Sequence, residues 1–123
     1  MAKVIIAEDD KFLLKAYQVK LNKSGFEVKY ATDGAEVLEI LKTFKPDLIV
    51  LDLIMPKKDG FYVLEQVKAN PDLKHIPILV TSNLGQKEDI DRAKALGAHD
   101  YIIKSDMSLN DLVAKISSAI ASH

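Results

Sequence analysis

Residues 47–60 read DLIVLDLIMPKKDG, and this stretch decides the fold. Four consecutive aliphatic residues, 48–51, lie between two aspartates, and segments with helical spacing lie on both sides of the stretch. A short Leu/Ile/Val run of this kind is typical of a parallel strand that is covered on both faces. The pattern therefore predicts a buried strand that ends at Asp52 and leads into a polar loop.

Four further short runs alternate with longer amphipathic segments, and they cover residues 3–8, 26–31, 76–81 and 101–104. The run 26–31 alternates apolar with charged residues, which predicts an edge strand. Strands that alternate with helices predict βαβ crossovers and a parallel sheet with helices on both faces. Because an eight-stranded barrel needs about twice this length, we expect an α/β fold with an open, doubly wound, five-stranded parallel sheet.

The segments between the runs differ in how strongly they predict a helix. The last one begins with Ser108 and Asp111 at the spacing of a capping box. The second has a stripe that extends to Phe44 before Pro46 closes it. The segment 86–96 is the weakest, because its apolar stripe is limited to Ile90, Ala93 and Leu96.

The composition limits the classes of function. The 123 residues fit a single domain, 1–123, and the net charge of −1 gives no basic surface for nucleic acid or an acidic membrane. The absence of cysteine excludes disulfides, thiolate metal sites and cysteine nucleophiles. The longest apolar runs are too short to cross a membrane, and the N-terminus lacks a signal-peptide pattern. We therefore expect a cytoplasmic domain with no nucleic-acid or membrane partner.

Polar residues follow the predicted strands. Glu8-Asp9-Asp10 ends the first run, and Asp52, Thr81 and Lys104 stand at the ends of the third, fourth and fifth. In open α/β sheets, ligands bind beyond the carboxyl ends of the strands. We therefore expect these side chains to meet at one edge of the sheet.

Together these residues indicate a metal-assisted phosphoryl site. Asp9, Asp10 and Asp52 would bring three carboxylates into one pocket, where their charges repel unless a cation joins them. Oxygen ligands without nearby histidine or cysteine suit Mg²⁺ or Ca²⁺. Lys104 and Thr81 offer a positive charge and a hydroxyl to a phosphoryl group, and Asp52 can act as a carboxylate nucleophile. Taken singly, each would be interpreted as a cap, a turn or a packing residue.

The chain resembles the receiver domain of response regulators over essentially its whole length. The matching pieces are Asp9-Asp10 after the first strand, the D-x-x-M-P-x-x-D-G string from Asp52 to Gly60, Thr81 in ILVTS, and Tyr101 with Lys104 in GAHDYIIK. The resemblance implies a flavodoxin-like (βα)5 fold with strand order 2-1-3-4-5. It also implies a phosphoacceptor switch, in which Asp52 receives a phosphoryl group with Mg²⁺ and later loses it by autodephosphorylation.

The resemblance further implies a role for each site residue. The metal would be held by Asp9, Asp10, Asp52 and the backbone carbonyl of Ile54. Lys104 would pair with the phosphoryl group and Thr81 would contact it. Tyr101 would swing inward when Thr81 moves, and so change the surface formed by the fourth helix, the fifth strand and the fifth helix.

Two more residues are expected to set the lifetime of the phosphorylated state. By resemblance, Ile54 and Asn83 flank the path of the attacking water. An oriented water speeds attack on phosphorus, but Ile54 cannot form a hydrogen bond to it, and Asn83 alone holds it loosely. We therefore expect slow autodephosphorylation, with Ile54 as the stronger brake.

The sequence leaves several alternatives open. The phosphoryl donor would be a histidine kinase or a histidine phosphotransfer protein, the downstream target is unknown, and an output switch and a phosphoryl shuttle fit equally well. A phosphorylation-independent interaction module would usually lack a site carboxylate or the lysine, and a flavin protein of this fold would not place residues 8–10 near the FMN phosphate. One departure from the family is Ser105, which stands where a proline with a preceding cis peptide is usual; a trans bond is expected here.

Overall fold

The computed structural model describes residues 2–121 and confirms the predicted parallel sheet. Every pair of neighbouring strands is parallel, and the order is β2-β1-β3-β4-β5, as the resemblance implied. The strands are β1 (Lys3–Ala7), β2 (Glu27–Ala31), β3 (Leu48–Asp52), β4 (Ile78–Ser82) and β5 (Asp100–Ile103).

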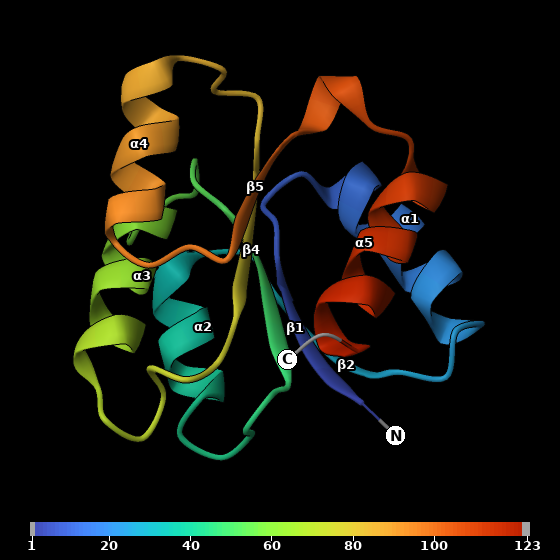
Figure 1. Ribbon diagram of the computed structural model, residues 1–123. Coiled ribbons are helices and arrows are strands. Elements are labelled where there is room, and N and C mark those ends of the chain that lie inside the picture. The colour runs from blue at the N-terminus through green and yellow to red at the C-terminus, as the bar shows by residue number, and fades with distance from the viewer. Residues whose placement is uncertain (1, 122–123) are drawn as a thin grey trace.

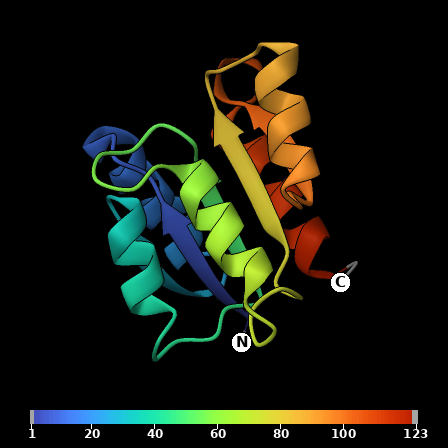
Figure 2. The ribbon, with the colours of Figure 1, turned by 90° about the vertical axis from the view of Figure 1, so that its left-hand side faces the viewer.

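The helices cover the two faces of this sheet unequally. On one face lie α1 (Lys11–Asn22) and α5 (Leu109–Ala121) (Figure 1). The other face carries α2 (Gly34–Ile40), α3 (Gly60–Ala69) and α4 (Lys87–Ala95), which Figure 2 shows in front of the sheet. A short 3₁₀ turn, η1 (Lys104–Asp106), connects β5 to α5. The structure is therefore a three-layer α/β fold. The part of the chain that the structure describes contains no helix with the length and hydropathy of a membrane span.

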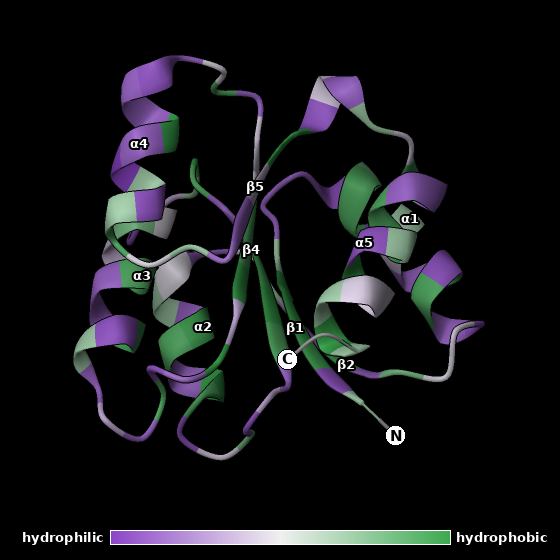
Figure 3. Ribbon diagram, in the orientation of Figure 1, coloured by the Kyte–Doolittle hydropathy of each residue, from purple (hydrophilic) through white to green (hydrophobic). Residues whose placement is uncertain are grey.

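Two hydrophobic clusters form the core because side chains alternate between the faces of each strand. In β1, Val4 and Ile6 pack toward α1 and α5, whereas Ile5 packs toward α2 and α3. The predicted strand 48–51 is completely buried, and β2 is an edge strand with its charged residues exposed, both as expected. Figure 3 shows the hydrophobic residues concentrated along the inner strands, whereas α4 is mainly hydrophilic.

The helix ends follow from local capping. α5 begins with the predicted capping box, in which Asp111 N donates to Ser108 Oγ and Ser108 N donates to Asp111 Oδ2. α4 forms, but it buries only Ala93 and has no side-chain cap, which agrees with its thin stripe. α2 is shorter than the pattern predicts: it ends at Ile40, and Phe44 is buried after a turn rather than in a helix.

All five strands run in the same direction, so their carboxyl ends meet at one edge, where the predicted site residues lie.

Candidate functional site

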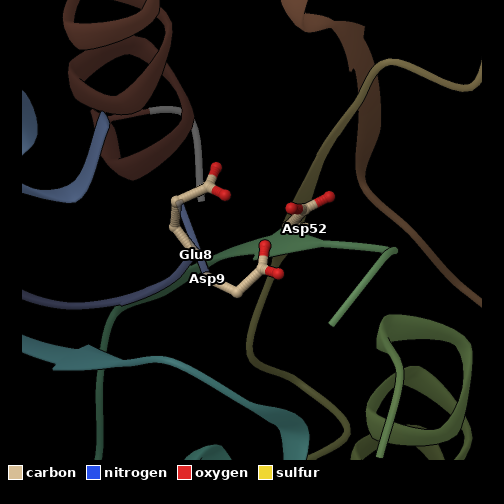
Figure 4. Close-up of side chains that lie close together, drawn as sticks. All are labelled: Glu8, Asp9 and Asp52. Atoms are coloured by element: carbon tan, nitrogen blue, oxygen red, sulfur yellow. The ribbon is translucent and has the colours of Figure 1, made fainter. Parts of the chain in front are cut away.

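Three carboxylates meet at the carboxyl edge of the two central strands. Ligand atoms of Glu8, Asp9 and Asp52 all lie within 4.8 Å of one another, and Figure 4 shows the three side chains close together at the ends of β1 and β3. Asp52 is the last residue of β3, and the pairing of β1 with β2 continues past its end, because Glu8 N donates to the carbonyl of Ala31 at 2.9 Å. Rigid strands therefore fix the positions of both buried carboxylates.

The composition of this acidic cluster differs from the predicted one at one residue. Asp10 lies outside it, because its Oδ1 accepts hydrogen bonds from the backbone N–H groups of Phe12 at 3.0 Å and Leu13 at 3.2 Å. These bonds make Asp10 the N-cap of α1. The third carboxylate is Glu8 instead. Of the three consecutive acidic residues, Glu8 and Asp9 join the cluster, whereas Asp10 caps α1 and lies at the edge of the same cleft.

Lys104 connects the two buried carboxylates of the cluster. Its Nζ lies 2.5 Å from Glu8 Oε1 and 3.0 Å from Asp52 Oδ2. Burial raises the pKa of Glu8 to about 7 and the charge of Asp52 adds to this rise, although Lys104 offsets part of it. Burial alone would lower the pKa of Lys104, but its hydrogen bonds to Glu8 and Asp52 outweigh burial and raise it. Lys104 is therefore a charged group that holds Asp52 in place.

The donor set fits a hard divalent cation. When all the groups are ionised, three carboxylates face one ammonium group, which leaves an excess of negative charge. All three donors offer oxygen, which Mg²⁺ and Ca²⁺ prefer. Asp9, the exposed member, can turn toward a cation without breaking an ion pair to Lys104.

Two hydroxyl residues stand at the end of β4, the predicted Thr81 and its neighbour Ser82. Adjacent residues of a strand point to opposite faces of the sheet. Thr81 is buried beside Asp52 in the ladder and hydrogen-bonds the hydroxyl of Tyr17 on α1, so it does not line the cleft. Ser82, which the sequence analysis did not single out, does line it. The alternation along β4 places Ser82 on the face of Val80, toward α3 and α4, whereas Thr81 shares the face of Asp52, its partner in the ladder.

The cluster opens into a cleft of about 280 Å³. Its walls are formed by Glu8, Asp9, Asp10, Asp52, Ile54, Ser82, Asn83, Leu84 and Lys104. Both residues expected to set the lifetime, Ile54 and Asn83, lie in this wall. Ile54 is 58% exposed although its backbone N–H donates to Asp52 Oδ1 at 3.2 Å. An apolar side chain therefore stands at the mouth of the cleft, directly beside the candidate nucleophile.

Tyr101 lies next to the cleft and contacts the loop after β4. Its ring packs against the core, and its hydroxyl donates to the carbonyl of Leu84 at 2.6 Å. It also hydrogen-bonds the side chain of Ser82. The predicted coupling between Thr81 and Tyr101 stays a prediction, and Ser82 is the residue of β4 that Tyr101 contacts in this structure. The Lys104–Ser105 peptide bond is trans, as expected without a proline at that position.

Comparisons with known proteins agree with this geometry. The family model of the response regulator receiver domain matches residues 4–117. The chain is 35% identical over 118 residues to a probable transcriptional regulator, ycf27, of Cyanophora paradoxa, which covers 96% of this chain and 48% of that protein. It is 31% identical over 116 residues to the DNA-binding dual master transcriptional regulator RpaA of Synechocystis, which covers 94% and 48%. The chain thus spans about half the length of these curated relatives.

Solved structures give the same result. The Mn²⁺-bound form of response regulator Rcp1 superposes with a TM-score of 0.83 at 31% identity, covering 96% of this chain and 91% of that one. The phosphorylated cyanobacterial phytochrome response regulator RcpA has a TM-score of 0.80 at 34% identity, covering 98% and 86%. The chain belongs to the response regulator receiver domain family of two-component signalling.

Proposed function

We propose that this chain is a phosphoacceptor switch whose single acceptor is Asp52. One observation carries the proposal: a buried aspartate at the end of a central strand is held by Lys104 at 3.0 Å and opens into an acidic cleft. A carboxylate fixed in this way is oriented for attack on phosphorus. The proposal is supported by membership of the receiver family and by the phosphorylated relative RcpA.

Glu8, Asp9 and Asp52 would hold Mg²⁺, together with the carbonyl of Ile54. The bound cation would supply positive charge to the oxygens of the phosphoryl group. This set replaces the predicted Asp10 by Glu8. The choice of Mg²⁺ over Ca²⁺ rests on phosphoryl chemistry, because Mg²⁺ commonly binds through one or two carboxylates and a phosphate. The Mn²⁺-bound form of Rcp1 supports a cation site in general, because it shows that a relative accepts a divalent cation.

In the proposed transfer, an oxygen of Asp52 forms a bond to phosphorus as the bond between phosphorus and the donor's imidazole nitrogen breaks. Lys104 would move from the carboxylate oxygen of Asp52 to the transferred group and neutralise part of its charge. The hydroxyl of Ser82 would donate a hydrogen bond to the same group. The donor would be a histidine kinase or a histidine phosphotransfer protein.

Signalling would use the contacts of Ser82. When its hydroxyl turns toward the phosphoryl group, the bond from Leu84 N to Ser82 Oγ, now 3.1 Å, breaks. Leu84 also accepts the hydrogen bond of Tyr101, so its movement would reposition that ring. The change would then reach the surface formed by α4, β5 and α5.

Ile54 and Asn83 would control the loss of the phosphoryl group to water from the wall of the cleft, with Leu84 as an additional apolar neighbour. An apolar wall cannot orient the attacking water, so the phosphorylated state should be long-lived.

The DNA-binding activity in the name of RpaA is that protein's, and this chain covers only 48% of it. For this chain itself no nucleic-acid partner is proposed, because a net charge of −1 gives no overall attraction to nucleic acid.

The experiment is labelling with acetyl phosphate and Mg²⁺, followed by intact-protein mass spectrometry. Wild type should gain one acid-stable, base-labile phosphoryl group, and Asp52→Asn should gain none. Asp59→Asn is the matched control, because Asp59 caps α3 through its Oδ1 and Asn can keep that bond. Equal labelling of Asp52→Asn and wild type would refute the assignment.

A further inference from the structure

The loop that follows Asp52, residues 53–59, is tied to the N-terminal end of α2. The N–H of Gly34 donates to the carbonyl of Lys58 at 2.9 Å, and Lys57 Nζ lies 3.5 Å from Asp33 Oδ2. The other oxygen of Asp33, Oδ1, caps the first turn of α2. One aspartate thus holds both the helix and the tip of the loop. We refer to Asp33, Gly34, Lys57 and Lys58 as the α2 clamp.

At the α2 clamp, α2 and the loop approach each other so closely that position 34 requires glycine. A Cβ atom there would overlap the carbonyl oxygen of Lys58 and lie 2.7 Å from its carbonyl carbon. Both are backbone atoms, which cannot rotate away as a flexible side chain can. Gly25 provides a contrast, because a Cβ there would meet nothing within 4 Å. Any residue other than glycine at position 34 must therefore push the loop away from α2.

The loop tip is also held in an unfavourable conformation. Lys57 has a φ of 65°, in the left-handed region that residues with a Cβ rarely adopt. Such a conformation persists only where the surroundings enforce it. The ion pair of Lys57 with Asp33 and the hydrogen bond from Gly34 to Lys58 provide these surroundings.

The base of the loop connects the clamp to the site. Gly60 N donates to the carbonyl of Leu53 at 3.0 Å, which closes the loop, and Ile54 N donates to Asp52 Oδ1 at 3.2 Å. The peptide group that follows Ile54 lies between this fixed base and the clamped tip. Its carbonyl is the oxygen that the proposed function gives to the metal.

We propose that Asp33 and Gly34 are positioning residues for metal binding. By fixing the tip of the loop they fix the direction of the Ile54 carbonyl, although neither residue touches the metal. This proposal rests on the proposed function. Removing groups that orient a metal ligand commonly weakens metal affinity by roughly 10- to 100-fold, so the clamp should have a measurable effect.

The first test measures Mn²⁺ affinity from the electron paramagnetic resonance signal of free Mn²⁺ in titrations of the full chain. Gly34→Ala should bind Mn²⁺ about tenfold more weakly than wild type. The control is Gly25→Ala, which loses stability because Gly25 has a φ of +78° but lies away from the site; it should keep wild-type affinity. Excess Mg²⁺ should restore labelling of Gly34→Ala by acetyl phosphate, because its nucleophile is intact.

Asp33→Asn provides a milder second variant if Gly34→Ala does not fold. Asparagine keeps an oxygen that can cap α2 but loses the charge that attracts Lys57, so Mn²⁺ should bind about twofold more weakly. Wild-type affinity in Gly34→Ala, or in Asp33→Asn if that is the folded variant, would overturn the clamp and leave the proposed function standing. A wild-type chain that binds no Mn²⁺ would overturn both.

Discussion

The two loops that border the cleft are held in different ways. Loop 53–59 is fastened at its base by Gly60 and at its tip by the α2 clamp, and most of these contacts are between backbone atoms. The loop after β4, residues 83–86, is held mainly by two hydroxyl groups, those of Ser82 and Tyr101. It leads into α4, which buries only Ala93.

This difference separates two tasks. Metal binding and attack on phosphorus need fixed atoms, because small displacements of the reacting groups cost rate. Signalling needs a region that opens at low cost, and such regions have few buried apolar contacts. The half of the site near α2 meets the first requirement, and the half near α4 meets the second.

The largest expected effect comes from a comparison of one glycine from each half of the site. A Cβ at Gly60 would overlap the carbonyl oxygen of Asp52 and lie 2.7 Å from Leu53 Cα, whereas a Cβ at Gly85 would make only an ordinary contact with Ile103 at 3.6 Å. Gly60→Ala should lower the free energy of unfolding by about 3 kcal/mol, and Gly85→Ala should change it by no more than about 0.5 kcal/mol. Urea denaturation measures both values. Similar losses in the two variants would show that the halves do not differ in rigidity.

The second test concerns the charge of the rigid half. Because the pKa of Glu8 is raised from 4.5 to about 7 in the folded state, the folded chain binds a proton more tightly than the unfolded chain does. Stability should therefore fall as the pH rises from about 4.5 to 7, in buffer with a chelator, and stay low above that range. Glu8→Gln should remove this fall and be more stable than wild type at pH 8 by about 2 kcal/mol.

Mg²⁺ provides the check on that interpretation. It should raise the melting temperature of wild type at pH 8, because it binds the folded state and relieves the repulsion. The rise should be smaller in Glu8→Gln. A pH dependence that is the same in both proteins would mean that Glu8 is not the group responsible.

The third test compares the two wall residues that are expected to set the phosphorylated lifetime. Ile54 belongs to the clamped loop, so it should block the water path steadily, whereas Asn83 belongs to the loosely held loop. Ile54→Asn should speed loss of the phosphoryl group by about tenfold, or about 1.4 kcal/mol of barrier. Asn83→Ala should change it by less than about twofold. Decay of the phosphorylated protein in Mg²⁺ measures both rates, and an unchanged rate in Ile54→Asn would leave Ile54 with a packing role alone.

The sequence predicted the strands well because burial on both faces gives a pattern that does not depend on distant contacts. The run 48–51, the edge strand 27–31 and the weak helix α4 all follow from local composition. Strand order came from the resemblance. The predicted end of α2 was wrong because Phe44 can be buried equally well from a helix or from a turn.

Most of the site was predicted from the sequence, and the acidic run at residues 8–10 is where the structure differs from the prediction. The acidic cluster contains Glu8, two residues before the predicted Asp10, and the wall of the cleft contains Ser82, the residue after Thr81. Asp10 instead caps α1, so the point at which the strand gives way to the helix decides which acidic residues join the cluster. Runs such as Glu-Asp-Asp and Thr-Ser contain chemically similar neighbours, so residue type alone cannot select the correct one. The α2 clamp could not be predicted at all, because it joins backbone groups that lie 24 residues apart.

The smallest expected effect tests how α4 is attached. Besides burying Ala93, α4 contacts α3 through Arg92, whose guanidinium carbon lies 4.0 Å from the centre of the Phe61 ring. An exposed cation–π contact is worth about 0.5–1 kcal/mol, so Arg92→Ala should speed amide hydrogen exchange in α4 by roughly two- to fivefold. Exchange in α2 should not change, because the α2 clamp does not involve Arg92. Because α4 has few other contacts, even this small loss should be confined to the half of the site near α4. Equal acceleration of exchange in α2 and α4 would mean that the two halves open together and that the comparison fails.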